Sequence, residues 1–132
     1  MSSNEDVSVL TANSNQVVDA DEHEQEDRLR LVSLTRDAMA LDKVIHNPFR
    51  LAIMTALSGA DSLTFTELMS LLSATYSTIG DNARKLEDAK YICCTKSFEA
   101  RIPVTRYRLT TKGQQALSGY VERMQSLIKA MR

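Results

Sequence analysis

The pattern of apolar and polar positions changes period twice along the chain, from a helical repeat before residue 90 to an alternating repeat up to residue 109, and then back to a helical repeat. The first part of the helical repeat predicts a helix that begins at Arg28. It should end near His46, because a proline follows at position 48 and the residue before a proline disfavours helical geometry. The apolar positions of this helix, spaced by three and four residues, are Leu31, Leu34, Ala38, Leu41 and Ile45.

Three shorter helices are predicted next. Asn47 can cap the second helix, with Pro48 at its first position and Gly59 at its end. After a short extended segment over residues 62–65, the pair Thr66-Glu67 begins the third helix. The fourth helix is capped by Thr75 or Ser77, and its buried stripe is Ile79, Ala83, Leu86 and Ala89.

The alternating repeat predicts two strands, at residues 91–96 and 104–109, joined as a hairpin by a loop over residues 97–103. Neighbouring side chains of a strand point to opposite faces, so Ile92 and Cys94 share one face and Cys93 lies on the other. Thr110 then caps a last helix. The predicted fold class is mainly α with a small β-hairpin. The apolar stripe of the last helix contains Leu117, Tyr120, Val121, Met124, Leu127, Ile128 and Met131.

The third and fourth helices form a candidate helix-turn-helix, in which the second helix of the pair enters a DNA major groove by its N-terminal end. The hairpin that follows would act as a wing. Residues 84–112 hold eight bases and three acids, a net charge of +5. Such a charge favours contact with phosphates, because counterion release dominates the affinity of proteins for duplex DNA.

Two groups of side chains are candidates for DNA contact, and each has a plainer alternative. The base-contact candidates could form an ordinary solvated face, and Arg84 and Lys85 could pair with Glu87 and Asp88 instead of phosphates. Arg50, near the start of the second helix, could pair with an acid inside the domain. The base-contact candidates are Tyr76, Ser77, Thr78, Asp81 and Asn82, and the backbone-contact candidates are Arg84, Lys85, Lys96, Arg101, Arg106 and Arg108.

The segments LDKVIHNPFRLAIMTAL, FTELMSLL, RKLEDAKYI and KSFEARIPVTRYRLTTKG, in this order, resemble the winged helix-turn-helix transcriptional regulators related to the MarR and ArsR groups. The resemblance covers residues 41–125. It implies a dimeric DNA-binding protein that dimerises through helices outside the reading head and needs no metal. Family members commonly carry a glycine where this chain has Lys90, so we expect a positive φ at Lys90.

The first and last predicted helices would leave apolar stripes exposed if nothing covered them. A twofold homodimer through these two helices is the simplest solution, and it would place two reading heads about one turn of DNA apart. The alternative is that the last helix folds back onto its own core. No clustered polar groups point to a pocket for a small-molecule effector. The predicted dimer interface contains Leu31, Leu34, Leu117, Val121, Met124 and Ile128.

The net charge of −1 divides unevenly along the 132 residues. Residues 1–27 hold eight acids and no Lys or Arg, whereas the rest of the chain carries +7. We therefore expect an acidic, disordered tail over residues 1–27 and one winged-helix domain with terminal dimerisation helices over residues 28–132. The tail could simply aid solubility, or it could compete for the basic face of the protein.

Several classes of function have no support in the sequence. His23 and His46 are isolated, Cys93 and Cys94 lack metal or redox spacing, and no catalytic set is evident, so neither an enzyme nor a cofactor is expected. No apolar run approaches the length of a membrane span, and no secretory signal is evident, so we expect a cytoplasmic protein. The main hypothesis is a sequence-specific regulator of transcription, a homodimeric repressor rather than an activator, that binds an inverted repeat in double-stranded DNA with the helix over residues 75–90 and the wing over residues 96–108. The alternative is a winged-helix module that binds another protein.

Overall fold

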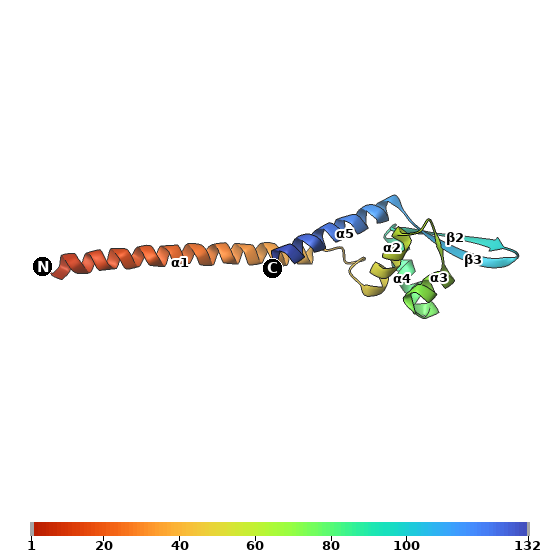
Figure 1. The fold of residues 1–132 in the computed structure, drawn as a ribbon, viewed down its shortest axis with the longest axis horizontal. Coiled ribbons are helices and arrows are strands. Elements are labelled where there is room, and N and C mark those ends of the chain that lie inside the picture. The colour runs from red at the N-terminus through yellow and green to blue at the C-terminus, as the bar shows by residue number, and fades with distance from the viewer. Residues whose placement is uncertain (1, 132) are drawn as a thin grey trace. The chain divides into compact units, whose positions relative to one another are not determined.

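The computed structural model describes the backbone of residues 2–131 and the side chains of residues 21–131. The chain divides into two compact units, Met1–Met39 and Ala40–Arg132. The first unit is helix α1 (Ser2–Met39). The second unit has the mainly helical fold with a small sheet that the sequence predicts (Figure 1). Its elements are α2 (Pro48–Ser58), β1 (Leu63–Thr64), α3 (Phe65–Leu72), α4 (Tyr76–Asp88), β2 (Ile92–Glu99), β3 (Ile102–Leu109) and α5 (Thr111–Ala130).

Helix α1 differs from its prediction at both ends. It is continuous across the expected boundary at residue 27, and it ends at Met39 instead of near His46. The side chains described in its acidic part, from Asp21 on, are exposed, so no packing stabilises that part of the helix. The disorder that we expect for residues 1–27 in solution therefore stays a prediction.

The segment between α1 and α2 is a sequence of turns, and it explains why the predicted helix is too long. The Asp42 carboxylate accepts hydrogen bonds from the backbone N–H groups of Val44 and Ile45, at 2.9 and 3.2 Å, which replaces helical pairing. Leu41 and Ile45 are buried in the core of the second unit, whereas Leu31 is exposed. The apolar positions assigned to one helical stripe thus belong to two different parts of the molecule.

Helices α2, α3 and α4 pack on one another, and their caps match the sequence pattern closely. Asn47 accepts from the N–H groups of Phe49 and Arg50, with Pro48 at the first position of α2. Thr75 caps α4, as predicted. The cap of α3 is Thr64, so α3 begins at Phe65 and not at Thr66.

The sheet has the order β1-β3-β2 with antiparallel neighbours. The predicted extended segment at residues 62–65 supplies the third strand, which pairs with β3 at Arg106 and Tyr107. The predicted loop over residues 97–103 is wrong. The strands continue until Glu99 pairs with Ile102, and the turn contains only residues 100 and 101.

Two close approaches join the sheet to the neighbouring helices. Lys90 has a φ of 67°, as predicted, and the N–H groups of Lys90 and Tyr91 bond the carbonyls of Glu87 and Leu86 to end α4. At the start of α5, Gly113 is buried against the backbone of Tyr91. No helix among residues 2–131 is both long enough and apolar enough to cross a membrane. The buried apolar core includes Ile45, Ile53, Met54, Leu57, Leu68, Ile79, Ala83, Leu86, Ile92 and Tyr107.

Candidate nucleic-acid interface

The exposed face of α4 lies opposite its buried stripe of Ile79, Ala83 and Leu86. Ser77, Asp81 and the cations Arg84 and Lys85 are all exposed, as a DNA-reading face requires. At the N-terminal end of α4, the Tyr76 side chain is 72% exposed, and its ring lies 4.6 Å from that of Phe65.

Both polar atoms of the Asn82 side-chain amide form hydrogen bonds within the domain. Its Nδ2 donates to the carbonyl of Thr78 at 2.8 Å, and its Oδ1 accepts from Arg50 Nη1 at 3.0 Å. Arg50 also donates to the carbonyl of Val44, so its partners are an amide and backbone carbonyls rather than an acid. The predicted adenine contact by Asn82 would require both of these intramolecular bonds to be exchanged.

The hairpin of β2 and β3 extends past helices α3 and α4, in the position of a wing (Figure 1). Its turn contains Ala100 and Arg101, with φ values of 50° and 70°. A two-residue turn with positive φ at both positions follows the twist of the strands, although it usually contains Asn or Gly. Arg101 is exposed at this tip, and Lys96 and Arg108 are exposed on the strands. The structure thus brings three of the predicted backbone-contact residues to one projecting element.

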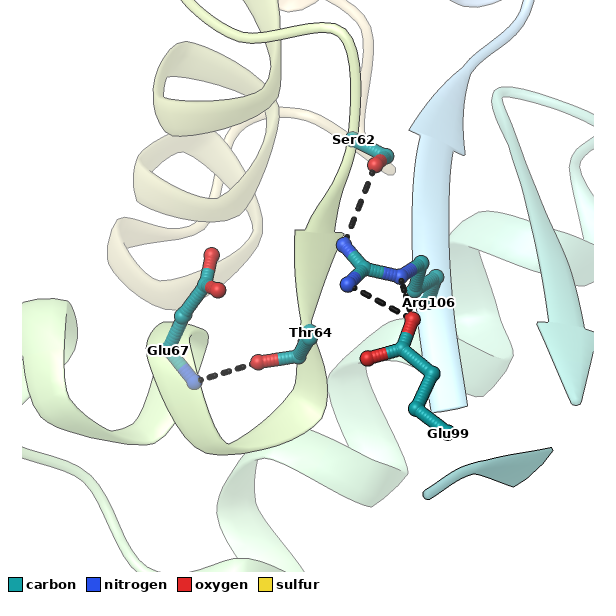
Figure 2. Close-up of polar contacts among 5 residues, drawn as sticks. All are labelled: Ser62, Thr64, Glu67, Glu99 and Arg106. Atoms are coloured by element: carbon teal, nitrogen blue, oxygen red, sulfur yellow. Dashed lines mark hydrogen bonds and ion pairs between the residues drawn. The ribbon is translucent and has the colours of Figure 1, made fainter. Parts of the chain in front are cut away.

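Arg106 differs from the other wing cations because it is already paired. Its guanidinium forms an ion pair with Glu99, with 2.8 Å between Nη2 and Oε1, and Figure 2 shows it lying between Glu99 and Ser62. The sequence prediction grouped Arg106 with Lys96 and Arg108 as backbone contacts, since it did not anticipate that Glu99 and Arg106 share a face of the longer hairpin.

A cavity of about 340 Å³ lies between α5 and the turns after residue 40, and no sequence pattern predicted it. Polar groups line it, although most are satisfied internally. The Tyr91 hydroxyl donates to Asp42, and Arg123 Nη1 donates to the carbonyl of Ala40 at 2.6 Å. Tyr120 shares a hydrogen bond of 2.7 Å with His46 Nδ1. These bonds tie the turns to α5 and to the start of β2.

Burial and nearby acidic groups raise two tyrosine pKa values. Burial, with the hydrogen bond to Asp42 and its charge, raises the pKa of Tyr91 to about 12. Burial and the neighbouring Cys94 and Glu87 raise the pKa of Tyr107 to about 12. Burial also raises the pKa of the Cys94 thiol, which favours the unreactive form, while Cys93 is exposed on the opposite face of β2. Within residues 21–131, no three His, Cys, Asp or Glu side chains cluster as a metal site.

Residues 49–128 match the family described as a winged helix DNA-binding domain. The chain belongs to this family. The match spans α2 to α5 and therefore includes the helix-turn-helix, the wing and most of the last helix. No curated protein matched the chain.

Solved structures of regulators share this winged-helix fold at low sequence identity. A transcriptional regulator homologue from Pyrococcus horikoshii OT3 is similar with a TM-score of 0.69 and 21% identity, over 75% of this chain and 97% of that one. The transcriptional regulator BldR from Sulfolobus solfataricus has a TM-score of 0.53 and 20% identity, over 82% and 77%. PadR from Bacillus subtilis, in complex with operator DNA, has a TM-score of 0.52 and 21% identity, over 57% and 47%.

Proposed function

We propose that this protein is a transcriptional regulator that binds double-stranded DNA at a specific sequence, through α4 and the wing. The observation that carries the proposal is the joint exposure of the α4 face and the wing-tip Arg101, on a domain of the winged helix DNA-binding family. The PadR structure, which contains operator DNA, supports the same partner. We further propose that it represses transcription, as a homodimer bound to an inverted repeat in the cytoplasm.

In this proposal, the two parts of the interface have different tasks. Tyr76, Ser77 and Asp81 on α4 contact base edges, with Thr78 beside them, and an acid such as Asp81 can accept from cytosine N4. Arg84, Lys85 and the wing cations Lys96, Arg101 and Arg108 contact phosphates and fix the register. Asn82 contributes mainly by holding α4 against Arg50.

The homodimer proposal rests on apolar side chains of α5 and of α1 that are exposed or half-buried. On α5, Val121 and Ile128 are exposed while Tyr120 and Leu127 are buried, so the helix has one covered and one open apolar side. On α1, Leu31 is exposed and Leu34 is half-buried. Burying such side chains in a twofold interface would remove apolar surface from water, which favours association.

The first experiment is selection of genomic DNA fragments by the purified protein near physiological salt, followed by sequencing. An enriched inverted repeat supports a dimeric sequence-specific regulator. On that site, Arg101→Ala should weaken binding and lower the salt dependence by about one phosphate, and Lys129→Ala on α5 is the matched control. Absence of any enriched sequence with folded protein would refute the proposal and favour the protein-binding alternative.

The dimer has a separate test. Val121→Glu with Ile128→Glu places two charges on the open apolar side of α5 and should reduce the sedimentation mass to that of a monomer. Gln115→Glu with Ser126→Glu adds the same charge to exposed positions on another side of α5 and should leave the mass unchanged. An unchanged mass in the first variant would remove the proposed interface.

A further inference from the structure

The wing extends beyond the strand that supports it. β1 pairs with β3 only at Arg106 and Tyr107, so the sheet is three-stranded there. Farther out, residues 96–99 and 102–105 pair only with each other (Figure 1). A two-stranded hairpin is marginally stable by itself in water. A wing that contacts DNA near its tip therefore needs a further restraint to hold its direction.

Arg106 supplies such a restraint from the point where the support ends. Its Nε and Nη2 donate to Glu99 Oε1 at 3.0 and 2.8 Å. Its Nη1 donates to Ser62 Oγ at 3.5 Å (Figure 2). Glu99 is the last residue of β2, and Ser62 directly precedes β1. One guanidinium thus joins the outer end of the wing to the segment that leads into β1 and α3.

The turn that follows Glu99 gives this ion pair a further effect. Ala100 and Arg101 both have positive φ, a conformation that costs energy for residues other than glycine. The ion pair fixes the residue immediately before the turn against the body of the sheet. It therefore opposes opening of the wing at the place where the backbone is least favourable.

We propose that Arg106 is a positioning residue that holds the wing through Glu99 and Ser62, and that it does not contact a DNA phosphate. The DNA part of this inference rests on the proposed function. The charge of Arg106 is offset by Glu99, and a phosphate would have to displace that carboxylate. Arg108, two residues along the same face of β3, is exposed and forms no ion pair with any side chain among residues 21–131. Arg108 is therefore the matched cation for comparison.

A double-mutant cycle on DNA affinity, measured at several salt concentrations, tests the inference. Arg106→Ala and Glu99→Gln should each weaken binding about two- to fivefold, the range of an exposed ion pair. The double variant should bind DNA no more weakly than either single variant. The slope of log affinity against log salt concentration should be the same as in the wild-type protein. The effect of Arg108→Ala should instead add to that of Glu99→Gln. The inference is overturned if Glu99→Gln tightens binding, or if Arg106→Ala lowers the slope by about 0.9, the value of one phosphate contact.

Amide hydrogen exchange in the free protein tests the restraint without DNA. Arg106→Ala and Glu99→Gln should both speed exchange at residues 96–105, whereas Arg108→Ala should not. The exchanged pair Glu99→Arg with Arg106→Glu should restore protection, because it keeps both charges. If the wild-type protein fails to bind DNA, the proposed function is refuted, but this measurement still shows whether the ion pair restrains the wing. Unchanged exchange in both single variants would overturn it.

Discussion

Gly113 is the position at which the smallest substitution should do the most damage. It is buried in the first turn of α5, directly against the backbone of Tyr91. A Cβ at this position would lie 2.0 Å from the Tyr91 carbonyl oxygen and 2.8 Å from its carbonyl carbon. Real Cβ contacts essentially never fall below 3.0 Å, so the start of α5 would have to move away from β2.

The cost follows from the bonds that this movement would stretch. Thr110 Oγ1 donates to the carbonyl of Lys90 at 2.7 Å and accepts from the N–H of Gly113 at 3.0 Å, and the N–H of Thr110 donates to the carbonyl of Tyr91 at 3.0 Å. Three hydrogen bonds at about 1 kcal/mol each give about 3 kcal/mol. Alanine recovers about 1 kcal/mol through its higher helix propensity. We expect Gly113→Ala to lower the free energy of unfolding by about 2 kcal/mol, within the range of overpacked sites.

Urea unfolding followed by circular dichroism measures this change, and the same helix supplies the control. A Cβ at Gly119 would have no atom within 4 Å other than those of its chain neighbours and its own helix backbone, so Gly119→Ala should raise the free energy of unfolding by about 1 kcal/mol. The free energies of unfolding of the two variants should therefore differ from each other by about 3 kcal/mol, with Gly113→Ala below wild type and Gly119→Ala above it. A Gly113→Ala protein within about 0.5 kcal/mol of wild type, the range of ordinary surface substitutions, would refute the close-approach argument.

Three further predictions concern other parts of the chain. Lys90→Gly should raise the free energy of unfolding by about 1 kcal/mol, because it removes the positive-φ strain at 67°, whereas Lys90→Ala should give no gain; equal effects of the two variants would contradict this. The free energy of unfolding should fall as pH rises from 10 to about 12, because the pKa of Tyr91 is near 10 in the unfolded state and about 12 in the folded state, so the unfolded state binds fewer protons in this range. Urea unfolding should show a smaller fall in Tyr91→Phe than in the wild-type protein. An identical fall in both proteins would count against the Asp42 contact. Amides of residues 1–27 should exchange within seconds in the free protein, because the side chains from Asp21 on are exposed and an isolated acidic helix is marginal; protection equal to that of α5 would show that these residues are ordered.

The elements of the second unit were predictable where local chemistry fixes them. Asn47, Thr75 and Thr110 each carry a side-chain oxygen that caps the helix after it, and the structure uses all three. The positive φ at Lys90 was predictable from the resemblance, because members of the resembled family commonly carry a glycine there, at the end of a helix. The opposite faces of Cys93 and Cys94 follow from the pleat of any strand.

The errors arose where contacts between distant residues override the local pattern. Leu41 and Ile45 continue the helical spacing of Leu31, yet Asp42 caps the turn and both side chains enter the core of the other unit. The short turn at Ala100 and Arg101 was missed because neither residue is one that usually adopts positive φ.

The candidate interface also has features that were predictable from the sequence and features that depend on tertiary contacts. The sequence alone determined the order of helices, the basic character of residues 84–112 and the exposed side of α4, because period and charge are local properties. Only the tertiary structure decided which of those charges stay available. Arg50 holds Asn82, and Arg106 holds Glu99, through contacts between residues far apart in the chain or on different strands. A cation in a sequence has no partner until folding brings one within hydrogen-bond distance, so its role depends on the fold.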